Sequence, residues 1–176
     1  MSETALWFLD KTQEIVIVLT AVAILYTRFS PGALYFTTGA VAASRVAKVL
    51  KLILRQQRPQ NARKSWTYGM PSTHSTVIIY YATYITLASL YLEPEVPYSS
   101  LPRLLPLAIV VPWAATIACS RVWLGHHTFS QVAAGSAAGV ICGLGWFWWW
   151  NHGAEELAGE ITSLVLERVL PWVAPK

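Results

Sequence analysis

Charged residues are scarce in this chain. Only 12% of its 176 residues are charged, whereas 55% are hydrophobic, and the mean hydropathy is +0.43. A soluble domain carries about 25% charged residues and a disordered chain has little hydrophobic content, so disorder is excluded and an ordinary soluble domain is disfavoured. Three stretches carry no charge at all, residues 65–92, 104–120 and 122–154. Because a membrane-spanning helix needs about 20 mostly apolar residues, the sequence predicts an integral membrane protein.

The chain has two cysteines and no clear secretory leader. Cys119 and Cys142 both lie within predicted spans, and we interpret them as small core residues rather than as a disulfide. Residues 1–14 lack the positive start and the small-residue cleavage site of a signal peptide. We therefore expect the first apolar segment to stay in the membrane.

The apolar runs are long and continuous, which favours helices over the short alternating segments of a β-barrel. We expect an all-α, polytopic transmembrane helix bundle that forms a single domain over residues 1–176. The predicted spans are residues 14–29, 33–54, 72–92, 103–120 and 130–150, followed by a short amphipathic or re-entrant helix at 161–173. Glycines at positions 135, 139 and 143 predict a smooth face for close helix packing, and the aromatic residues 146–150 are typical of an interfacial belt.

The net charge of +4 is concentrated in one part of the chain. Lys51, Arg55, Arg58, Arg63 and Lys64 follow one another with no acidic residue among them. A patch this small beside so much apolar sequence disfavours nucleic acid as a partner. It favours a phosphate carried by a membrane lipid.

Counting five spans brings three polar segments, residues 51–58, 70–74 and 120–131, to the same membrane face. This convergence holds whichever way the protein is inserted. The remaining cations divide evenly between the two faces, so the positive-inside rule does not predict the orientation.

The three segments supply the groups that phosphoryl transfer requires. Lys51, Arg58 and Arg121 can form a cationic cage for a phosphate, with forked guanidinium donors and a compact ammonium. Ser72 and Thr73 open a helix, whose N-terminal amides and dipole can face the same anion. We expect no metal or other cofactor, since positioning and charge stabilisation are the main requirements.

Two histidines complete this set. Of His74 and His127, one can act as the nucleophile and the other as the general acid for the leaving oxygen. Gln131 follows His127 by four residues, which places both on one helical face, and its amide can fix the imidazole tautomer.

The three segments together resemble the signature of the type 2 phosphatidic acid phosphatase (PAP2) superfamily, K-x6-R-P, P-S-G-H and S-R-x5-H-x3-D. The resemblance extends from Lys51 to Gln131, nearly half of the chain. It implies that His127 is the nucleophile that forms a phosphohistidine and that His74 protonates the leaving group. The remaining motif residues, Lys51, Arg58, Ser72, Thr73 and Arg121, would surround the phosphate.

Two positions depart from the general signature, because Thr73 replaces its glycine and Gln131 its aspartate. Both departures resemble the eukaryotic dolichyl-diphosphatase branch, as do residues 68–75 and 127–132. That branch implies a dolichyl (polyprenyl) diphosphate substrate in the bilayer of the endoplasmic reticulum, an active site that faces the lumen, and recycling of the lipid carrier for protein N-glycosylation.

Other interpretations remain open from the residues alone. The substrate can instead be phosphatidate, a sphingoid phosphate or undecaprenyl diphosphate, and Gln131 is compatible with a non-catalytic relative. The three cage cations can be interfacial anchors, and Ser72 can serve only as a helix N-cap. Arg45 and Lys48 can support the site indirectly or pair within the helix bundle.

Overall fold

The computed structural model describes residues 3–60, 62, 66–92 and 105–173 of the chain. Throughout these residues the regular structure is helical, so the prediction of an all-α fold is confirmed. The elements are α1 (Glu3–Asp10), α2 (Thr12–Tyr26), α3 (Pro31–Leu54), α4 (Thr73–Tyr91), α5 (Leu105–Trp123), α6 (Phe129–Trp149), the π-helical turn η1 (Trp150–Ala154) and α7 (Glu155–Val173).

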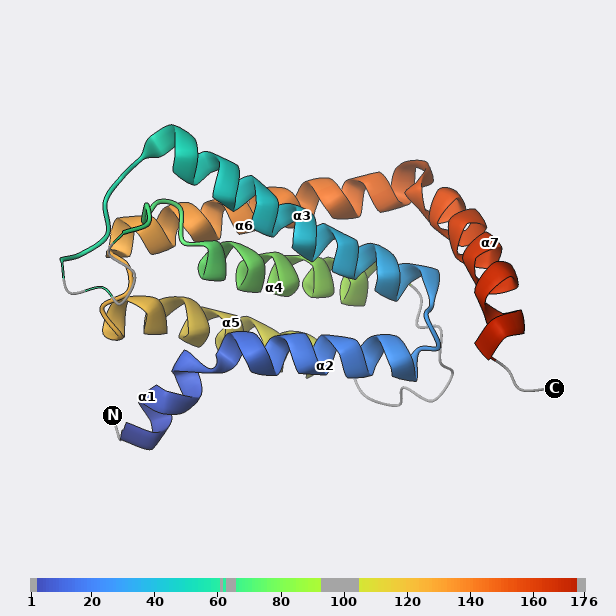
Figure 1. Ribbon diagram of the computed structural model, residues 1–176, viewed down its shortest axis with the longest axis horizontal. Helices are drawn as coiled ribbons and strands as arrows, with labels where there is room; N and C mark the ends of the chain where they lie inside the picture. The colour runs from blue at the N-terminus through green and yellow to red at the C-terminus, as the bar shows by residue number, and fades with distance from the viewer. Residues whose placement is uncertain (1–2, 61, 63–65, 93–104, 174–176) are drawn as a thin grey trace.

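Helices α2 to α6 run side by side along the long axis of the molecule, and α7 turns away from them at one end (Figure 1). At the opposite end α3 and α5 finish and α4 and α6 begin. The three polar segments that the sequence predicts on one face therefore lie at one end of the bundle.

Local sequence explains the boundaries of the helices that carry the site. The N-cap Ser30 accepts a hydrogen bond from the amide of Ala33, and α3 begins with a proline at its first position. Thr128 and Gln131 form a capping box at the start of α6, in which each side chain accepts from the other residue's backbone amide. These caps fix the residue at which each helix begins.

Three expected boundaries change. The predicted span 14–29 is replaced by α1 and α2, and α2 ends at Tyr26, after which Arg28 and Phe29 adopt positive φ values of 50° and 62°. The helix expected at 161–173 begins at Glu155, because Gly153 with φ of 112° separates it from α6. The span expected at 103–120 begins at Leu105 and continues to Trp123, residues 103 and 104 lying outside the described residues.

Two helical segments among the described residues are long and apolar enough to cross a membrane, Leu105–Trp123 and Phe129–Val165. Glu14–Tyr26 is a shorter apolar helix. The expectation of about five spans accordingly stays a prediction.

The glycine face of α6 packs directly on α4, as the sequence predicts. A Cβ atom on Gly135 would lie 2.6 Å from the carbonyl oxygen of Ser72, and one on Gly139 would lie 2.5 Å from that of Thr76. A Cβ on Gly143 would lie 2.8 Å from the Thr83 Cβ. Small residues thus allow the two backbones that carry the second and third motifs to approach closely.

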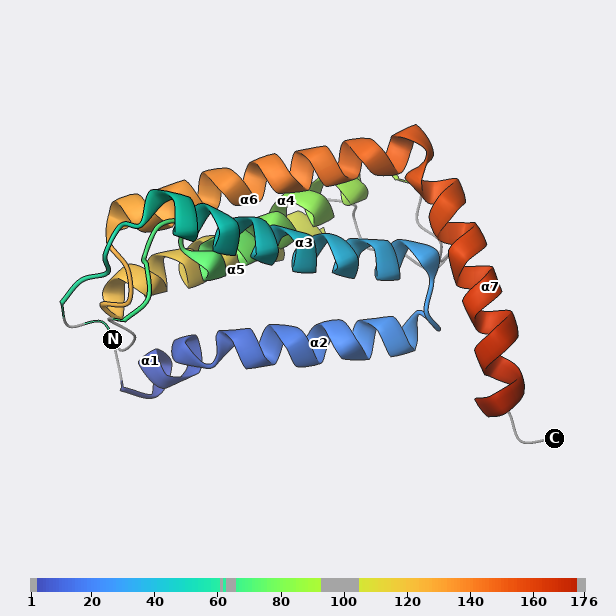
Figure 2. The same ribbon diagram turned by 45° about the horizontal axis from the view of Figure 1, so that its top comes forward.

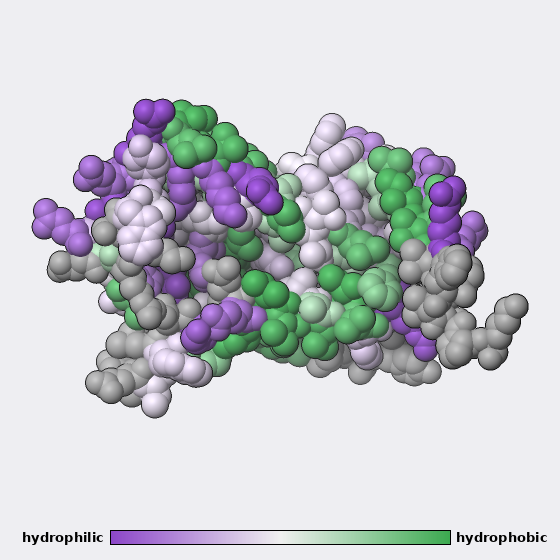
Figure 3. Space-filling model, viewed as in Figure 1, coloured by the Kyte–Doolittle hydropathy of each residue, from purple (hydrophilic) through white to green (hydrophobic). Residues whose placement is uncertain are grey.

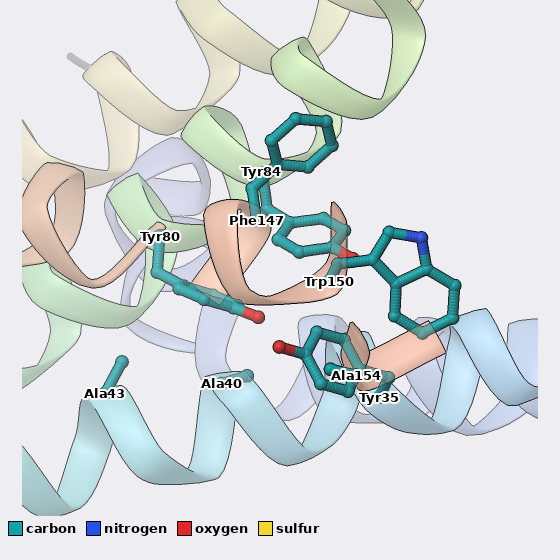
Figure 4. Close-up of a cluster of buried hydrophobic side chains, with 8 residues drawn as sticks. All are labelled: Tyr35, Ala40, Ala43, Tyr80, Tyr84, Phe147, Trp150 and Ala154. Carbon is teal, nitrogen blue, oxygen red and sulfur yellow. The ribbon is translucent and has the colours of Figure 1, made fainter. Parts of the chain in front are cut away.

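An aromatic core joins α3, α4 and α6 at the other end of the bundle (Figure 4). Tyr35, Tyr80 and Tyr84 surround Phe147 and Trp150 there. The interpretation of residues 146–150 as an interfacial belt is therefore wrong for Phe147 and Trp150, which are buried in this aromatic core.

The cysteine interpretation also changes in part. Cys119 and Cys142 are both free thiols. Cys119 is exposed, however, so it is not the core residue that we expected, whereas Cys142 is half-buried against the aromatic core.

Candidate active site

A cavity of about 970 Å³ lies between α2, α3, α4 and α5. Its lining includes six of the predicted site residues, Lys51, Arg58, Thr73, His74, Arg121 and His127. Among the lining residues that the structure describes, none is acidic. The predicted convergence of the three polar segments is therefore confirmed. Hydrophilic side chains gather at this end of the molecule, and others lie at the opposite end, near α7 (Figure 3).

His127 sits in the loop between α5 and α6 with 6% of its surface exposed. Its Nε2 atom lies 3.3 Å from Nη1 of Arg58, and its Nδ1 atom lies 3.2 Å from Oε1 of Gln131. A guanidinium can only donate hydrogen bonds, so Nε2 is the acceptor and the imidazole proton lies on Nδ1, which donates to Gln131. The lone pair of Nε2 consequently faces the cations, where a phosphorus atom would be held.

The amide of Gln131 has a defined orientation. Its Oε1 accepts from the backbone N–H of Thr128 at 3.2 Å. Its Nε2 donates to Oε1 of Gln56 at 3.0 Å and to the carbonyl oxygen of Gln57 at 2.8 Å. A carboxylate has no N–H group for these two acceptors, so the amide rather than an acid matches this environment.

Sequence reasoning missed the residues that orient Gln131. Gln56 and Gln57 occupy free positions of the first motif, and the carbonyl of Gln56 also accepts from the amide of Gly69 at 2.7 Å. A Cβ on Gly69 would lie 2.5 Å from the Gln131 side chain. The only sequence signal was the two side-chain amides that directly precede Arg58. The sequence alone did not indicate a partner for these amides.

Burial and charge keep His127 neutral. Desolvation by burial, followed by the positive charges of Arg58 and Lys51, lowers the pKa of His127 from 6.5 to about 3, although the hydrogen bond to Gln131 opposes the shift. The imidazole is therefore unprotonated at neutral pH, as a nucleophile requires.

The two cations of the first motif approach the site from the end of α3. Lys51 Nζ donates to the carbonyl oxygen of Tyr68 at 3.2 Å, and Arg58 Nη1 donates to that of His126 at 3.4 Å. The Nε atom of Arg58 is buried and makes no hydrogen bond within the described part of the chain. Arg58 thus retains a donor for an anion in the cavity.

The start of α4 places the second motif. Ser72 is fully buried, and its Oγ caps α4 by accepting from the amide of Ser75 at 3.3 Å. The amide of Ser72 donates to the carbonyl of Gln131 at 2.9 Å. Thr73 and His74 line the cavity instead, and as the first residues of the helix they have backbone N–H groups without intrahelical acceptors. Phosphate binding by Ser72 itself stays a prediction.

Arg121 connects the site to the N-terminal helix. This side chain is 4% exposed, and its Nη2 donates to the carbonyl oxygen of Leu9 and to Ser120 Oγ. The hydroxyl of Thr12 donates to the same Leu9 carbonyl at 2.9 Å. The sequence did not indicate that the junction of α1 and α2 belongs to the wall of the site.

No group of three or more His, Cys, Asp or Glu side chains in the described ranges is placed to hold a metal ion. What the lining offers is a set of permanent cations, three histidines (His74, His126 and His127) and a helix N-terminus. This arrangement can bind a phosphoryl group and present an imidazole nitrogen to it.

Known proteins are similar to this chain in sequence. Lipid phosphate phosphatase gamma from Arabidopsis thaliana is 30% identical over 142 residues, which cover 78% of this chain and 62% of that protein. Dolichyldiphosphatase 1 from Dictyostelium discoideum is 37% identical over 105 residues, 56% of this chain and 44% of the relative. Dolichyldiphosphatase 1 from Rhinolophus ferrumequinum is 27% identical over 168 residues, which cover 90% of this chain and 66% of that protein.

These matches cover less than two thirds of the length of each of the three relatives. No solved structure matches the chain significantly. The model of the PAP2 superfamily matches residues 32–154, which include all three motifs and the helices that carry them. Together with the convergence of those motifs on one cavity, this match shows that the chain belongs to the PAP2 superfamily.

Proposed function

We propose that this protein is a membrane lipid phosphatase that hydrolyses dolichyl diphosphate to dolichyl phosphate and inorganic phosphate. In this proposal the chain crosses the membrane of the endoplasmic reticulum about five times, with the cavity open to the lumen. The product would return to the lipid-carrier cycle of protein N-glycosylation.

The observation that carries the proposal is the composition of the cavity wall. Beside its cationic end, the same cavity is lined by apolar side chains of α2, α3 and α4, among them Val16, Ile24, Val41 and Val77. A soluble phosphate ester needs no such surface. A lipid phosphate needs both surfaces in one cavity, since its head group is anionic and its chain is apolar.

The geometry supports a two-step transfer. Nε2 of His127 attacks the terminal phosphorus, a phosphorus–nitrogen bond forms, and the bond from phosphorus to the bridging oxygen breaks as His74 protonates that oxygen. Water then attacks the phosphohistidine and gives its proton back to His74, which releases inorganic phosphate and restores both imidazoles. Lys51, Arg58 and Arg121 stabilise the charge on the phosphoryl oxygens in both steps.

The polyprenyl substrate rests on the resemblance of residues 68–75 and 127–132 to the dolichyl-diphosphatase branch. Two of the three relatives described above are named dolichyldiphosphatase 1, and the third is named lipid phosphate phosphatase gamma. Another lipid phosphate, such as phosphatidate, is the competing substrate.

The test uses the full chain reconstituted in phospholipid vesicles. Phosphate release is measured from dolichyl diphosphate, phosphatidate and a sphingoid phosphate, each at the same mole fraction. We expect dolichyl diphosphate to be hydrolysed with the highest kcat/KM, and we expect His127→Ala and Arg121→Ala to abolish release and leave membrane insertion unchanged.

His152→Ala is the matched control, because His152 is exposed in η1 and does not line the cavity. It should retain full activity. Release that persists in His127→Ala would contradict the phosphohistidine mechanism. A higher kcat/KM for phosphatidate would mean that phosphatidate, and not dolichyl diphosphate, is the substrate. No turnover of any lipid by the wild type would indicate a non-catalytic relative.

A further inference from the structure

Two cations in the cavity have no role in the mechanism above. Arg45 and Lys48 line the cavity together with Lys51, at intervals of three residues along α3. Within the described part of the chain neither side chain makes a hydrogen bond or an ion pair. Their charges are therefore not compensated by the residues that the structure places around them.

Both side chains are exposed, and their position along α3 would make this lack of compensation costly inside a membrane. Arg45 precedes the end of α3 at Leu54 by nine residues, which is about 14 Å along the helix axis, and Lys48 lies about 9 Å from that end. If α3 spans the membrane, both charges lie well inside a hydrocarbon layer of about 30 Å. Cations at such depths usually face a wet cavity and mark the path of an anion.

The order of the lining side chains along α3 matches the order of groups in a lipid diphosphate. Lys51 belongs to the cationic end with His127, Lys48 and Arg45 follow one and two turns deeper, and Val41 begins the apolar part. A substrate that presents its terminal phosphate to His127 and its chain to the apolar wall would place its second phosphate between these two regions.

We propose that Lys48 and Arg45 bind the lipid-side phosphate of a diphosphate substrate and so select diphosphates over monophosphates. A monophosphate ester places no anion at this depth, because its chain begins directly after the phosphoryl group held by the cage. The inference rests on the proposed function, in which the lipid-side phosphate is the leaving group. The two cations would then also stabilise the charge that develops on the bridging oxygen.

The test compares two substrates with the same chain, farnesyl diphosphate and farnesyl monophosphate, in the reconstituted full-length protein. In Arg45→Gln/Lys48→Gln we expect kcat/KM for the diphosphate to fall by at least about tenfold, as expected for the loss of charge-assisted contacts. We expect kcat/KM for the monophosphate to change by less than about twofold by the same reasoning. The unchanged monophosphate activity shows that the variant is folded.

Two controls separate charge at this position from charge in general. Arg55→Gln removes an exposed cation at the end of the same helix that does not line the cavity, and it should change neither rate. Arg45→Lys/Lys48→Arg keeps both charges and should keep most of the preference for the diphosphate. Equal losses on the two substrates in the double glutamine variant would overturn the proposal.

A binding measurement keeps this inference distinct from the proposed function. The affinity of His127→Ala for a non-hydrolysable farnesyl diphosphonate and a farnesyl monophosphonate is measured by calorimetry, with and without the two glutamine substitutions. The ratio of the two affinities should fall when the cations are removed, and an unchanged ratio would contradict the inference. A wild type that prefers the diphosphonate and hydrolyses neither farnesyl ester would contradict only the catalytic proposal.

Discussion

The side-chain amide of Gln131 takes part in four hydrogen bonds, two through each end. It fixes the tautomer of His127 without adding a negative charge next to the imidazole. An aspartate at this position would hold the imidazolium form more strongly. With glutamine, burial and the two neighbouring cations mainly determine the protonation of His127, and the proposed nucleophile stays neutral.

This environment predicts how the protein responds to acid. Because the pKa of His127 in the folded protein, about 3, lies below its ordinary value of 6.5, the unfolded chain takes up the proton first as the pH falls. The contribution of this group to stability is present above pH 6.5 and is lost as the pH falls toward 3.

We therefore expect the thermal unfolding midpoint of the ligand-free protein to fall between pH 7 and pH 5. The fall should be smaller in His127→Gln, which has no titrating group at this position. Nitrogen-15 shifts of the imidazole should show a neutral ring at pH 5. A ring that titrates near 6.5, with the same loss of stability in both proteins, would contradict the burial argument.

The pair of helices α4 and α6 positions the second and third motifs relative to each other. The amide of Ser72 donates to the carbonyl of Gln131 where the two helices meet. Beyond this contact the glycines of α6 let the backbones approach along the length of the pair. The separation between His74 and His127 therefore depends on residues that lie outside the cavity.

A substitution on the glycine face tests this dependence. Gly139→Ala places a Cβ 2.5 Å from the backbone oxygen of Thr76, which must move, so the protein should lose about 1–3 kcal/mol of stability as overpacked cores do. Gly145→Ala in the same helix is the control, because its Cβ meets nothing within 4 Å. It should be neutral or stabilising, since alanine favours the helix.

Thermal unfolding in detergent measures both changes, and phosphate release measures the consequence for the site. Gly139→Ala should lower the unfolding midpoint and the rate. Equal behaviour of the two variants would show that α4 and α6 are not held together by this face.

Across the whole molecule, the cavity lies between α2 and the helices that carry the motifs. Figure 2 shows α2 lying alongside α3 and joined to it by a short connection. The wall that α2 supplies is apolar apart from Thr12 and Thr20, with Val16, Ile17 and Ile24 among its members. In a lipid complex α2 would thus contact mainly the chain, whereas α3 and α4 would contact both the head group and the chain.

Filling the apolar part should separate these two contacts. Ala21 of α2 lines the cavity, so Ala21→Trp should lower kcat/KM for dolichyl diphosphate by about tenfold or more, the effect of displacing a few buried methylene groups. Isopentenyl diphosphate, whose chain is too short to reach this position, should be hydrolysed at the wild-type rate.

Ala115→Trp provides the control for a bulky substitution, since Ala115 is exposed on α5 and does not line the cavity. It should leave the hydrolysis of both substrates unchanged. A loss on isopentenyl diphosphate in Ala21→Trp would mean that the substitution disturbs the catalytic end instead.

Much of the fold and of the site could be predicted because their signals are local or can be counted. The apolar runs predicted the helices. Because successive spans alternate in direction, counting them predicted that Lys51, His74 and His127 lie at one end of the bundle. The contact of Gln131 with His127 was also predicted, but the further partners of Gln131 and Arg121 could not be. Gln56 and the carbonyl of Leu9 contribute acceptors whose directions depend on tertiary packing, and neither belongs to a periodic pattern.

The bond between Arg121 and the carbonyl of Leu9 has a practical consequence for comparative enzymology. A deletion that removes the residues before Thr12 would also remove an acceptor of a proposed phosphate-binding arginine, although more than 100 residues separate the two in sequence. Proteins prepared with different amino-terminal lengths would then differ in the resting position of this guanidinium. Their rates would describe different active sites, so kinetic comparisons among variants require one common amino terminus.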